Sequence, residues 1–153
     1  MKIRWAPPSI TEDERKSVLK VFDSNWFTQG PITELVEKKI CEITKSKYAV
    51  MTNNGTSALI CSLLAHEIGP GDEVIVPSFT FVATVNAILS VGAKPVLVDC
   101  NAETFNTEVK FMKNKVTKKT KAILPVDVSG MPVDLDSFQD FANENNLVLI
   151  RDS

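Results

Sequence analysis

The sequence predicts an α/β fold of three layers, α/β/α, in which helices cover both faces of a mainly parallel sheet. Strand-like and helical patterns alternate five times along the chain, and this order is typical of βαβ units. The strand-like runs are continuously apolar, as in "EVIVP" at 73–77, which indicates strands buried on both faces. The chain has 153 residues and is 44% hydrophobic, so it can bury a sizeable core.

Two helices are expected before the first strand. Thr11 and Glu14 have the spacing of a capping box and predict that "TEDERKSVLKVF" is helical. The segment "PITELVEKKICEI" has apolar residues at helical spacing, and the turn-rich loop "SNWFTQGP" connects the two helices. The expected apolar faces consist of Val18, Leu19 and Phe22 in the first helix and of Ile32, Leu35, Val36, Ile40 and Ile43 in the second.

Short strands and longer helices then alternate. Apolar runs flanked by turn residues predict the strands, and apolar residues at helical spacing predict the helices. Gly92 is a natural end for one helix. Asp134 is a natural cap for the last helix, whose inward residues would be Leu135, Phe138 and Phe141. The expected strands are 48–52, 73–77, 95–99, 121–128 and 147–152, and the expected helices are 55–68, 80–92, 106–116 and 134–146.

Charge and cysteine usage exclude several kinds of partner. The chain has 17 Lys and Arg residues against 19 Asp and Glu residues, so neither nucleic acid nor an anionic membrane surface is expected to bind it. No apolar run approaches the ~20 residues that span a bilayer, and no group of side chains has the spacing of metal ligands. Cys41, Cys61 and Cys100 lie far apart without a CxxC motif, which indicates reduced thiols in or near the core of a cytoplasmic protein.

Polar segments follow the expected strands, and ligands of open α/β sheets bind beyond the carboxyl ends of the strands. In "NNGTSAL", Gly55 permits a tight turn, and Thr56 and Ser57 open a helix whose N-terminus suits a phosphate. Ordinary helix capping by Asn54 or Thr56 is the alternative. The segment contains neither the P-loop lysine nor a GxGxxG motif.

An aromatic residue and a carboxylate add to this pattern. Phe79 and Phe81 lie two residues apart in "PSFTF", so one can stack on a flat heterocycle while the other packs. Asp152 follows the last expected strand, where a carboxylate can pair with a protonated ring nitrogen. Taken alone, each has an ordinary structural alternative, core packing or a helix cap. Together with the phosphate cradle they are three of the four parts of a pyridoxal-phosphate site, and the fourth is a lysine that forms a Schiff base.

Several motifs resemble one enzyme family over nearly the whole chain. The segments "WFTQGP", "NNGTSAL", "GPGDEVIVPSFTFVATVNAIL", "VGAKPVLVD" and "ETFN" are similar to the amino-terminal half of the DegT/DnrJ/EryC1/StrS aminotransferases, from about Pro8 to Asp152. The resemblance implies an aspartate-aminotransferase-like large domain of fold type I, here incomplete. It divides the chain into an N-terminal helix with a substrate-side loop, 1–33, and a partial cofactor-binding domain, 34–153.

The family pattern also assigns roles to single residues. The resemblance implies that Gly55, Thr56 and Ser57 hold the phosphate of pyridoxal 5′-phosphate. It further implies that Phe81 stacks on the pyridine ring and that Asp152 pairs with the ring nitrogen.

Other positions concern the substrate side. Thr28, Gln29 and Gly30 match a loop near the substrate in the family. Asp127 and Ser129 stand where the family usually has His and Tyr, and Arg151 stands where it usually has Glu. The departures at 127 and 129 affect the expected substrate contacts rather than the expected cofactor contacts.

No lysine of this chain is expected to form the Schiff base. The resemblance places that lysine roughly thirty residues after Asp152, and therefore beyond Ser153. Lys94 is expected at the opposite edge of the sheet, and the lysines at 45, 47 and 110–121 lie on polar turns or helix ends. The chain is therefore expected to be cut inside its cofactor site and to be inactive alone.

The expected function of the whole enzyme is transfer of an amino group from an amino donor to a nucleotide-linked keto sugar, in a homodimer. Two alternatives stay open. One is a sugar dehydratase with the same cofactor, which the residue at the lysine position would distinguish. The other is a non-catalytic cofactor-binding or interaction remnant, which would bind the cofactor without turnover.

Overall fold

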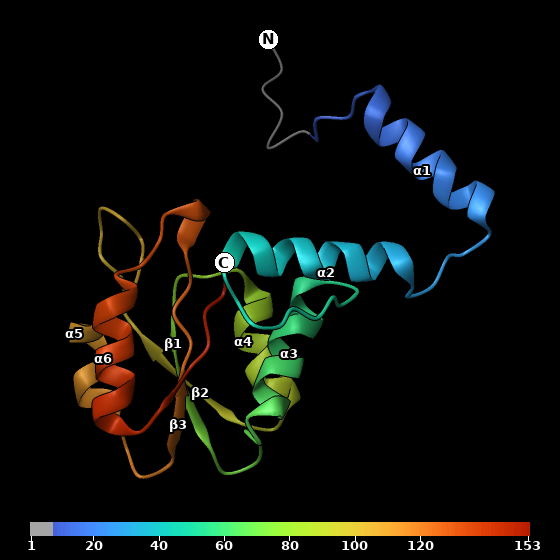
Figure 1. Cartoon of the computed structure of the whole chain (residues 1–153). Helices are drawn as coiled ribbons and strands as arrows, with labels where there is room; N and C mark the ends of the chain where they lie inside the picture. The colour runs from blue at the N-terminus through green and yellow to red at the C-terminus, as the bar shows by residue number, and fades with distance from the viewer. Residues whose placement is uncertain (1–7) are drawn as a thin grey trace. The chain divides into compact units, whose positions relative to one another are not determined.

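The computed structural model describes residues 8–153, and the chain divides into two compact units, 1–51 and 52–153. The described part of the first unit contains α1 (Glu12–Ser24) and α2 (Pro31–Thr44), labelled in Figure 1. The predicted capping box is confirmed, because the side chains of Thr11 and Glu14 each bond the other residue's backbone N–H. The division at residue 33 that the family resemblance implies stays a prediction.

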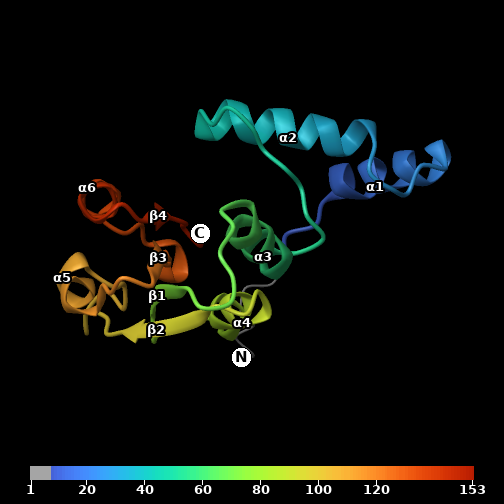
Figure 2. The same cartoon turned by 90° about the horizontal axis from the view of Figure 1, so that it is seen from below.

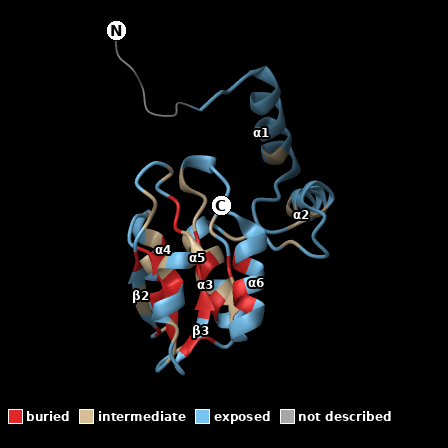
Figure 3. Cartoon of the chain, turned by 90° about the vertical axis from the view of Figure 1, so that its left-hand side faces the viewer, coloured by how far each residue is buried: buried red, intermediate tan, exposed pale blue. Residues whose placement is uncertain are grey.

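The apolar faces of these two helices are exposed. Neither α1 nor α2 contains a buried residue, as the absence of red on them in Figure 3 shows. On the predicted face of α2, exposure ranges from 37% for Val36 to 66% for Ile43. The helical spacing was therefore predicted correctly, but no surface among the described residues covers it.

The second unit contains a four-stranded sheet in which every neighbouring pair is parallel. The strands are β1 (Glu73–Pro77), β2 (Lys94–Val98), β3 (Thr120–Ile123) and β4 (Val148–Leu149), and their spatial order is β2-β1-β3-β4. Val126 and Asp152 form one further parallel bridge after β3 and β4. The predicted parallel sheet is confirmed.

Helices cover both faces of this sheet, as predicted. The helices α3 (Gly55–Ala65) and α4 (Val82–Ser90) lie on one face, and α5 (Val109–Met112) and α6 (Leu135–Asn145) lie on the other (Figure 2). Neighbouring residues of β1 feed two separate cores, because successive side chains point to opposite faces. Val74 and Val76 pack with Leu63 of α3, whereas Ile75 packs with Phe138 of α6.

Helix ends follow the local signals in the sequence. Gly92 lies just after the C-cap of α4 with a φ of +79°, a conformation that glycine adopts without strain. Asp134 caps α6 by accepting a hydrogen bond from the N–H of Ser137. Phe138 and Phe141 are buried as predicted, but Leu135 is 40% exposed and was predicted wrongly to face inward.

Three other expectations need correction. Residues 48–52 form no strand, because a strand needs a hydrogen-bonded neighbour and no described residue pairs with this run. The helix expected over 106–116 is only α5 and a short 3-10 turn, since Asn106 and Thr107 bond to Met131 O and Asp99 O instead. All three cysteines are free, but Cys61 is exposed rather than near the core.

No helix within residues 8–153 is long and apolar enough to cross a membrane. The same residues contain no group of three or more potential metal ligands.

Candidate functional site

The candidate site lies at the carboxyl ends of β1, β3 and β4. Asp152 is held there by its backbone, because its N–H donates to Pro125 O at 3.1 Å and its C=O accepts from Asp127 N–H at 2.9 Å. The helix α4 follows β1 and therefore begins at this edge. The helix α3 leads through a short turn into the amino end of β1, so its N-terminus also lies at the carboxyl edge (Figure 1).

A chain of hydroxyl groups orients the Asp152 carboxylate. Thr84 Oγ1 donates to Asp152 Oδ2 at 2.7 Å, and Thr80 Oγ1 lies 2.8 Å from Thr84 Oγ1. Because the single proton of Thr84 goes to the carboxylate, Thr80 must be the donor to Thr84. Thr84 is fully buried. The other carboxylate oxygen, Asp152 Oδ1, makes no hydrogen bond with the described residues. One oxygen of Asp152 is fixed and the other is open.

Thr80 and Thr84 are functional candidates that the sequence analysis missed. Thr80 lies just before the N-cap residue Phe81, and Thr84 lies in the first turn of α4. Their hydroxyl groups therefore meet where the helix begins. That spacing of two hydroxyls after a strand was the available signal. It could not have been connected to Asp152, which is 68 residues beyond Thr84.

The start of α3 has the open donors of an anion site. Asn54 is the N-cap and accepts from Ser57 N–H at 2.8 Å, so the ordinary capping interpretation is correct for Asn54. The N–H groups of Gly55 and Thr56 keep no hydrogen-bond partner among the described residues. A Cβ on Gly55 would meet nothing within 4 Å. The cap thus leaves two donors and open space for a ligand.

The two phenylalanines of "PSFTF" have different surroundings. Phe79 packs against Phe105 with ring centroids 5.1 Å apart. Phe81 is the N-cap residue of α4 and is 78% exposed. Phe79 is itself 49% exposed, but its ring has an aromatic neighbour and the ring of Phe81 has none among the described residues. Stacking of Phe81 on a flat ligand stays a prediction.

Asp127 and Ser129 follow β3 but do not share one environment. The Asp127 side chain is only 6% exposed, and it is paired with Arg151. Ser129 is exposed and has a left-handed backbone with a φ of 54°. Burial raises the pKa of Asp127, but hydrogen bonds from Val133 N–H, Ser153 and Arg151 outweigh this and hold that pKa below its ordinary value. The hydrogen bonds and the ion pair of Asp127 are therefore made to other groups of the protein.

The loop with Thr28, Gln29 and Gly30 belongs to the first unit. Trp26 Nε1 donates to Gln29 O at 3.0 Å, and a Cβ on Gly30 would lie 2.4 Å from the same indole. Gly30 is thus required for the close approach of the ring. A cavity of about 560 Å³ lies beside this loop between α1 and the start of α2, and Thr28 and Gly30 are in its wall.

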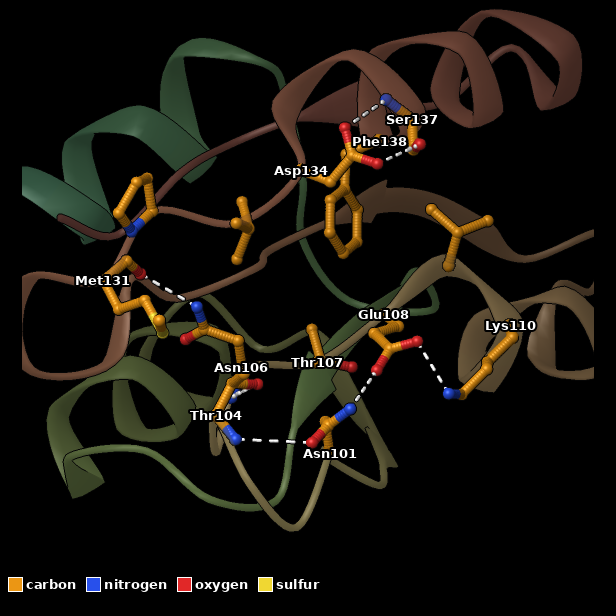
Figure 4. Close-up of a pocket in the computed structure, with 13 residues that line it drawn as sticks. Asn101, Thr104, Asn106, Thr107, Glu108, Lys110, Met131, Asp134, Ser137 and Phe138 are labelled. Atoms are coloured by element: carbon orange, nitrogen blue, oxygen red, sulfur yellow. Dashed lines mark hydrogen bonds and ion pairs between the residues drawn. The ribbon is translucent and has the colours of Figure 1, made fainter.

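A second cavity, of about 410 Å³, lies between the loop at 101–110 and the start of α6. Figure 4 shows that its polar side chains bond mainly to one another. Glu108 accepts from Asn101 at 2.6 Å and pairs with Lys110 at 2.7 Å, and Asn106 Nδ2 donates to Met131 O at 2.8 Å. These interactions connect the loops that flank the carboxyl edge. They leave no charged group directed at a ligand.

Lys94 is at the opposite edge of the sheet, as expected. It begins β2 and pairs with Glu73, the first residue of β1, at 2.9 Å. It therefore cannot reach a ligand bound at the carboxyl ends.

Comparison with known proteins identifies the family. The model of the DegT/DnrJ/EryC1/StrS aminotransferase family matches residues 8–153. The GDP-perosamine synthase of Caulobacter vibrioides is 40% identical over 99% of this chain. The chain spans 41% of the length of that relative.

Solved structures agree with this match. A Streptococcus pneumoniae protein assigned as a sugar aminotransferase, in its PMP form, superposes with a TM-score of 0.92 at 35% identity, over 100% of this chain and 42% of that one. The NtdA protein of Bacillus subtilis, with the cofactor PMP bound, superposes with a TM-score of 0.88 at 37% identity, over 93% of this chain and 34% of that one. The fold is therefore that of the fold-type I aminotransferases, and this chain belongs to the DegT/DnrJ/EryC1/StrS aminotransferase family.

Proposed function

We propose that the protein is a pyridoxal-phosphate-dependent aminotransferase that transfers an amino group to a nucleotide-linked keto sugar. Family membership supports the reaction class. The similarity to a GDP-perosamine synthase supports a nucleotide-linked sugar as substrate, and the PMP bound in similar structures supports the cofactor. The observation that carries the proposal is the half-open Asp152 carboxylate at the same sheet edge as the open N-terminus of α3.

The residues at this edge fit the three parts of the cofactor. The two free N–H groups and the positive end of the dipole at the start of α3 suit its phosphate, and the hydroxyls of Thr56 and Ser57 can add donors. The exposed ring of Phe81 suits the flat face of the pyridine. The open Oδ1 of Asp152 suits the ring N–H.

Each residue has a specific task in the proposed reaction. Bound pyridoxal phosphate supplies an electron-withdrawing ring that stabilises negative charge at the carbon that loses a proton. Asp152 accepts the hydrogen bond from the ring nitrogen and keeps that nitrogen protonated. Thr84 fixes the other oxygen of Asp152, so that Oδ1 keeps its direction. Phe81 excludes water from one face of the ring.

The remaining parts of the proposed enzyme come from the resemblance. The Schiff-base lysine would follow Ser153, Thr28, Gln29, Gly30 and Ser129 would lie on the substrate side, and two subunits would form each pair of sites. Proteins that match the chain are named as a synthase and as aminotransferases, so the dehydratase alternative is not favoured. A cytoplasmic location is part of the same proposal.

A product assay tests the reaction. The enzyme with the segment that would carry the lysine is given pyridoxamine phosphate and a GDP-linked keto sugar, and the sugar nucleotide is then analysed by mass spectrometry. The proposal predicts conversion of the keto group to an amine, with formation of pyridoxal phosphate in equal amount. Loss of water from the sugar without amine incorporation would instead indicate a dehydratase, and would contradict the proposal.

Borohydride labelling tests the position of the lysine. Reduction of the protein with bound pyridoxal phosphate fixes the cofactor to its lysine, and peptide mapping then locates it. The proposal predicts that no lysine within residues 1–153 carries the label. A labelled lysine at 94, or anywhere within 110–121, would contradict the assignment of the carboxyl edge.

A further inference from the structure

The side chain of Asp127 connects several segments near Asp152. Its Oδ2 accepts from Arg151 Nε at 2.7 Å and from Ser153 Oγ at 2.9 Å, and lies 2.6 Å from Arg151 Nη2. Its Oδ1 accepts from Val133 N–H at 2.9 Å. A single carboxylate, whose side chain is 6% exposed, thus receives four contacts from three residues, Val133, Arg151 and Ser153.

Two of the residues that contact Asp127 are the neighbours of Asp152 in the sequence. Arg151 precedes Asp152 and Ser153 follows it, and both are bound to the same oxygen of Asp127. The backbone N–H of Asp127 also donates to the carbonyl oxygen of Asp152 at 2.9 Å. Asp127 therefore contacts all three consecutive residues, 151–153.

This arrangement matters because Asp152 lies at the end of a short strand. β4 contains only Val148 and Leu149, and the pairing beyond it is the single bridge between Val126 and Asp152. A short strand end with one bridge can open locally at small cost in free energy. Backbone hydrogen bonds continue past β4, from Asp152 N–H to Pro125 O and from Asp127 N–H to Asp152 O. The side-chain contacts of Asp127 add a further restraint to them.

We propose that Asp127, through Arg151 and Ser153, is a positioning residue that sets the place of the Asp152 carboxylate in the cofactor site. The inference rests on the proposed function, because it gives Asp152 the ring nitrogen as its partner. Thr84 fixes the direction of the carboxylate from the α4 side, and Asp127 fixes the backbone that carries it. Asp127 thus fixes where the carboxylate stands, and Thr84 fixes how it is turned.

The proposal also assigns a role to Arg151 and to the residue at 127, both of which depart from the family pattern. The two departures contact each other, so each charge has its partner. Without Arg151, Asp127 would be a buried carboxylate lacking its counter-charge, and such groups are strongly unfavourable. The pair therefore serves as a restraint within the protein rather than as a substrate contact.

A matched cluster at the other edge of the sheet provides the control. Glu73 has a side chain that is 9% exposed, with Lys94 Nζ at 2.9 Å and Thr117 Oγ1 donating at 2.7 Å. It resembles the Asp127 cluster in burial, in charge and in having two side-chain partners. It lies at the amino ends of β1 and β2, away from Asp152.

The test compares Asp127→Asn, Arg151→Gln and Glu73→Gln in the purified protein. Pyridoxamine phosphate is the probe, because it binds without a Schiff base, and its dissociation constant is measured by absorbance and fluorescence. Hydrogen exchange at the amides of residues 127 and 152 is followed in the cofactor-free protein. Arg151→Lys, which keeps the charge and loses the paired geometry of the guanidinium, provides a milder variant that tests partial rescue.

The expected result separates the two edges. Asp127→Asn and Arg151→Gln weaken pyridoxamine phosphate binding about tenfold, as loss of an orienting partner does, and both speed exchange at residues 127 and 152. Arg151→Lys retains part of the affinity. Glu73→Gln leaves the dissociation constant and both exchange rates unchanged, even where it lowers the melting temperature.

Other results would overturn the inference. The inference would be wrong if both Asp127→Asn and Arg151→Gln bound pyridoxamine phosphate with wild-type affinity. It would also be wrong if Glu73→Gln lost as much affinity as they do. A wild-type protein that binds no pyridoxamine phosphate would contradict the proposed function instead. In that case hydrogen exchange alone tests whether Asp127 positions residue 152. Exchange rates at residues 127 and 152 that stay unchanged in Asp127→Asn and Arg151→Gln would refute this role, and faster rates would support it.

Discussion

The two edges of the sheet contain similar acidic clusters but differ in what is left unpaired. At the amino edge, Glu73 is bound by Lys94 and Thr117. At the carboxyl edge, Asp127 is bound by Arg151 and Ser153, and beside it Asp152 keeps one oxygen without a partner among the described residues. A fully paired carboxylate is a structural group, whereas a half-paired one at a ligand-binding edge marks a site.

The electrostatics of the two paired clusters agree with this distinction. The hydrogen bond from Thr117, followed by that from Lys94, lowers the pKa of Glu73. The pKa of Asp127 is also lowered, since its hydrogen bonds outweigh the effect of burial. Both groups are thus held as carboxylates by partners within the protein, and neither is suited to exchange protons with a substrate near neutral pH.

The largest effect should come from Asp152→Asn at the carboxyl edge. The amide cannot keep the ring nitrogen protonated, so turnover should fall on the order of 10²–10³-fold, as for loss of a preorganised charge contact. Steady-state kinetics of the aminotransferase reaction measures this, with Glu73→Gln as the control from the other edge. Equal losses of turnover in the two variants would show that the edges do not differ.

The next effect should come from Thr84→Val, which preserves shape and removes the donor to Asp152. A hydrogen bond to a charged group contributes about 1.5–3 kcal/mol, so binding of pyridoxamine phosphate should weaken by about tenfold or more. Titration of the cofactor measures it. Thr84→Ser retains the hydroxyl and should restore most of the affinity, and failure of this rescue would contradict the role of the hydroxyl chain.

A smaller effect is expected for Phe81→Leu. Loss of ring stacking costs about 0.5–1.5 kcal/mol, so the cofactor affinity should fall several-fold while protein stability stays nearly unchanged, because Phe81 is 78% exposed. Phe79→Leu is the matched control, since that ring packs on Phe105. It should lower the melting temperature and leave cofactor affinity intact, and the opposite pattern would exchange the roles of the two rings.

The smallest effect concerns pH. The folded-state pKa of Asp127 is lowered, so its contribution to stability is present above its unfolded pKa of about 3.9 and disappears as pH falls through the folded pKa. Asp127→Asn should therefore be less stable than wild type at pH 7, and the gap should narrow on acidification. Denaturant titrations at several pH values measure the gap. A gap that stays constant down to low pH would contradict the assigned cause.

The sequence predicted the layers of the second unit because its signals are local. Continuous apolar runs in β1 to β3, Gly92 after α4 and Asp134 before α6 each act within a few residues. The strand expected at 48–52 failed because pairing depends on a neighbour elsewhere, and Tyr48 is 74% exposed. The apolar faces of α1 and α2 were recognised for the same local reason, but their burial depends on a surface that spacing does not specify.

The candidate site shows the same limit. Gly55, Phe81 and Asp152 could be selected because each follows a predicted strand or opens a helix. Thr84 and Asp127 could not be linked to Asp152, because contacts over 68 residues and across two strands depend on sheet order. The departure at 127 was expected to concern substrate contacts, and this stays a prediction. Its contact with Arg151 could not be predicted, because the two residues follow different strands.

The protonation state of the cofactor ring nitrogen tests the central claim most directly. Nuclear magnetic resonance of pyridoxamine phosphate labelled with ¹⁵N in the ring, bound to the protein at neutral pH, reports this state. The account predicts a protonated nitrogen in the wild type and in Glu73→Gln, and an unprotonated nitrogen in Asp152→Asn. An unprotonated nitrogen in the wild type, or one that stays protonated in Asp152→Asn, would contradict the assignment of Asp152 as its partner.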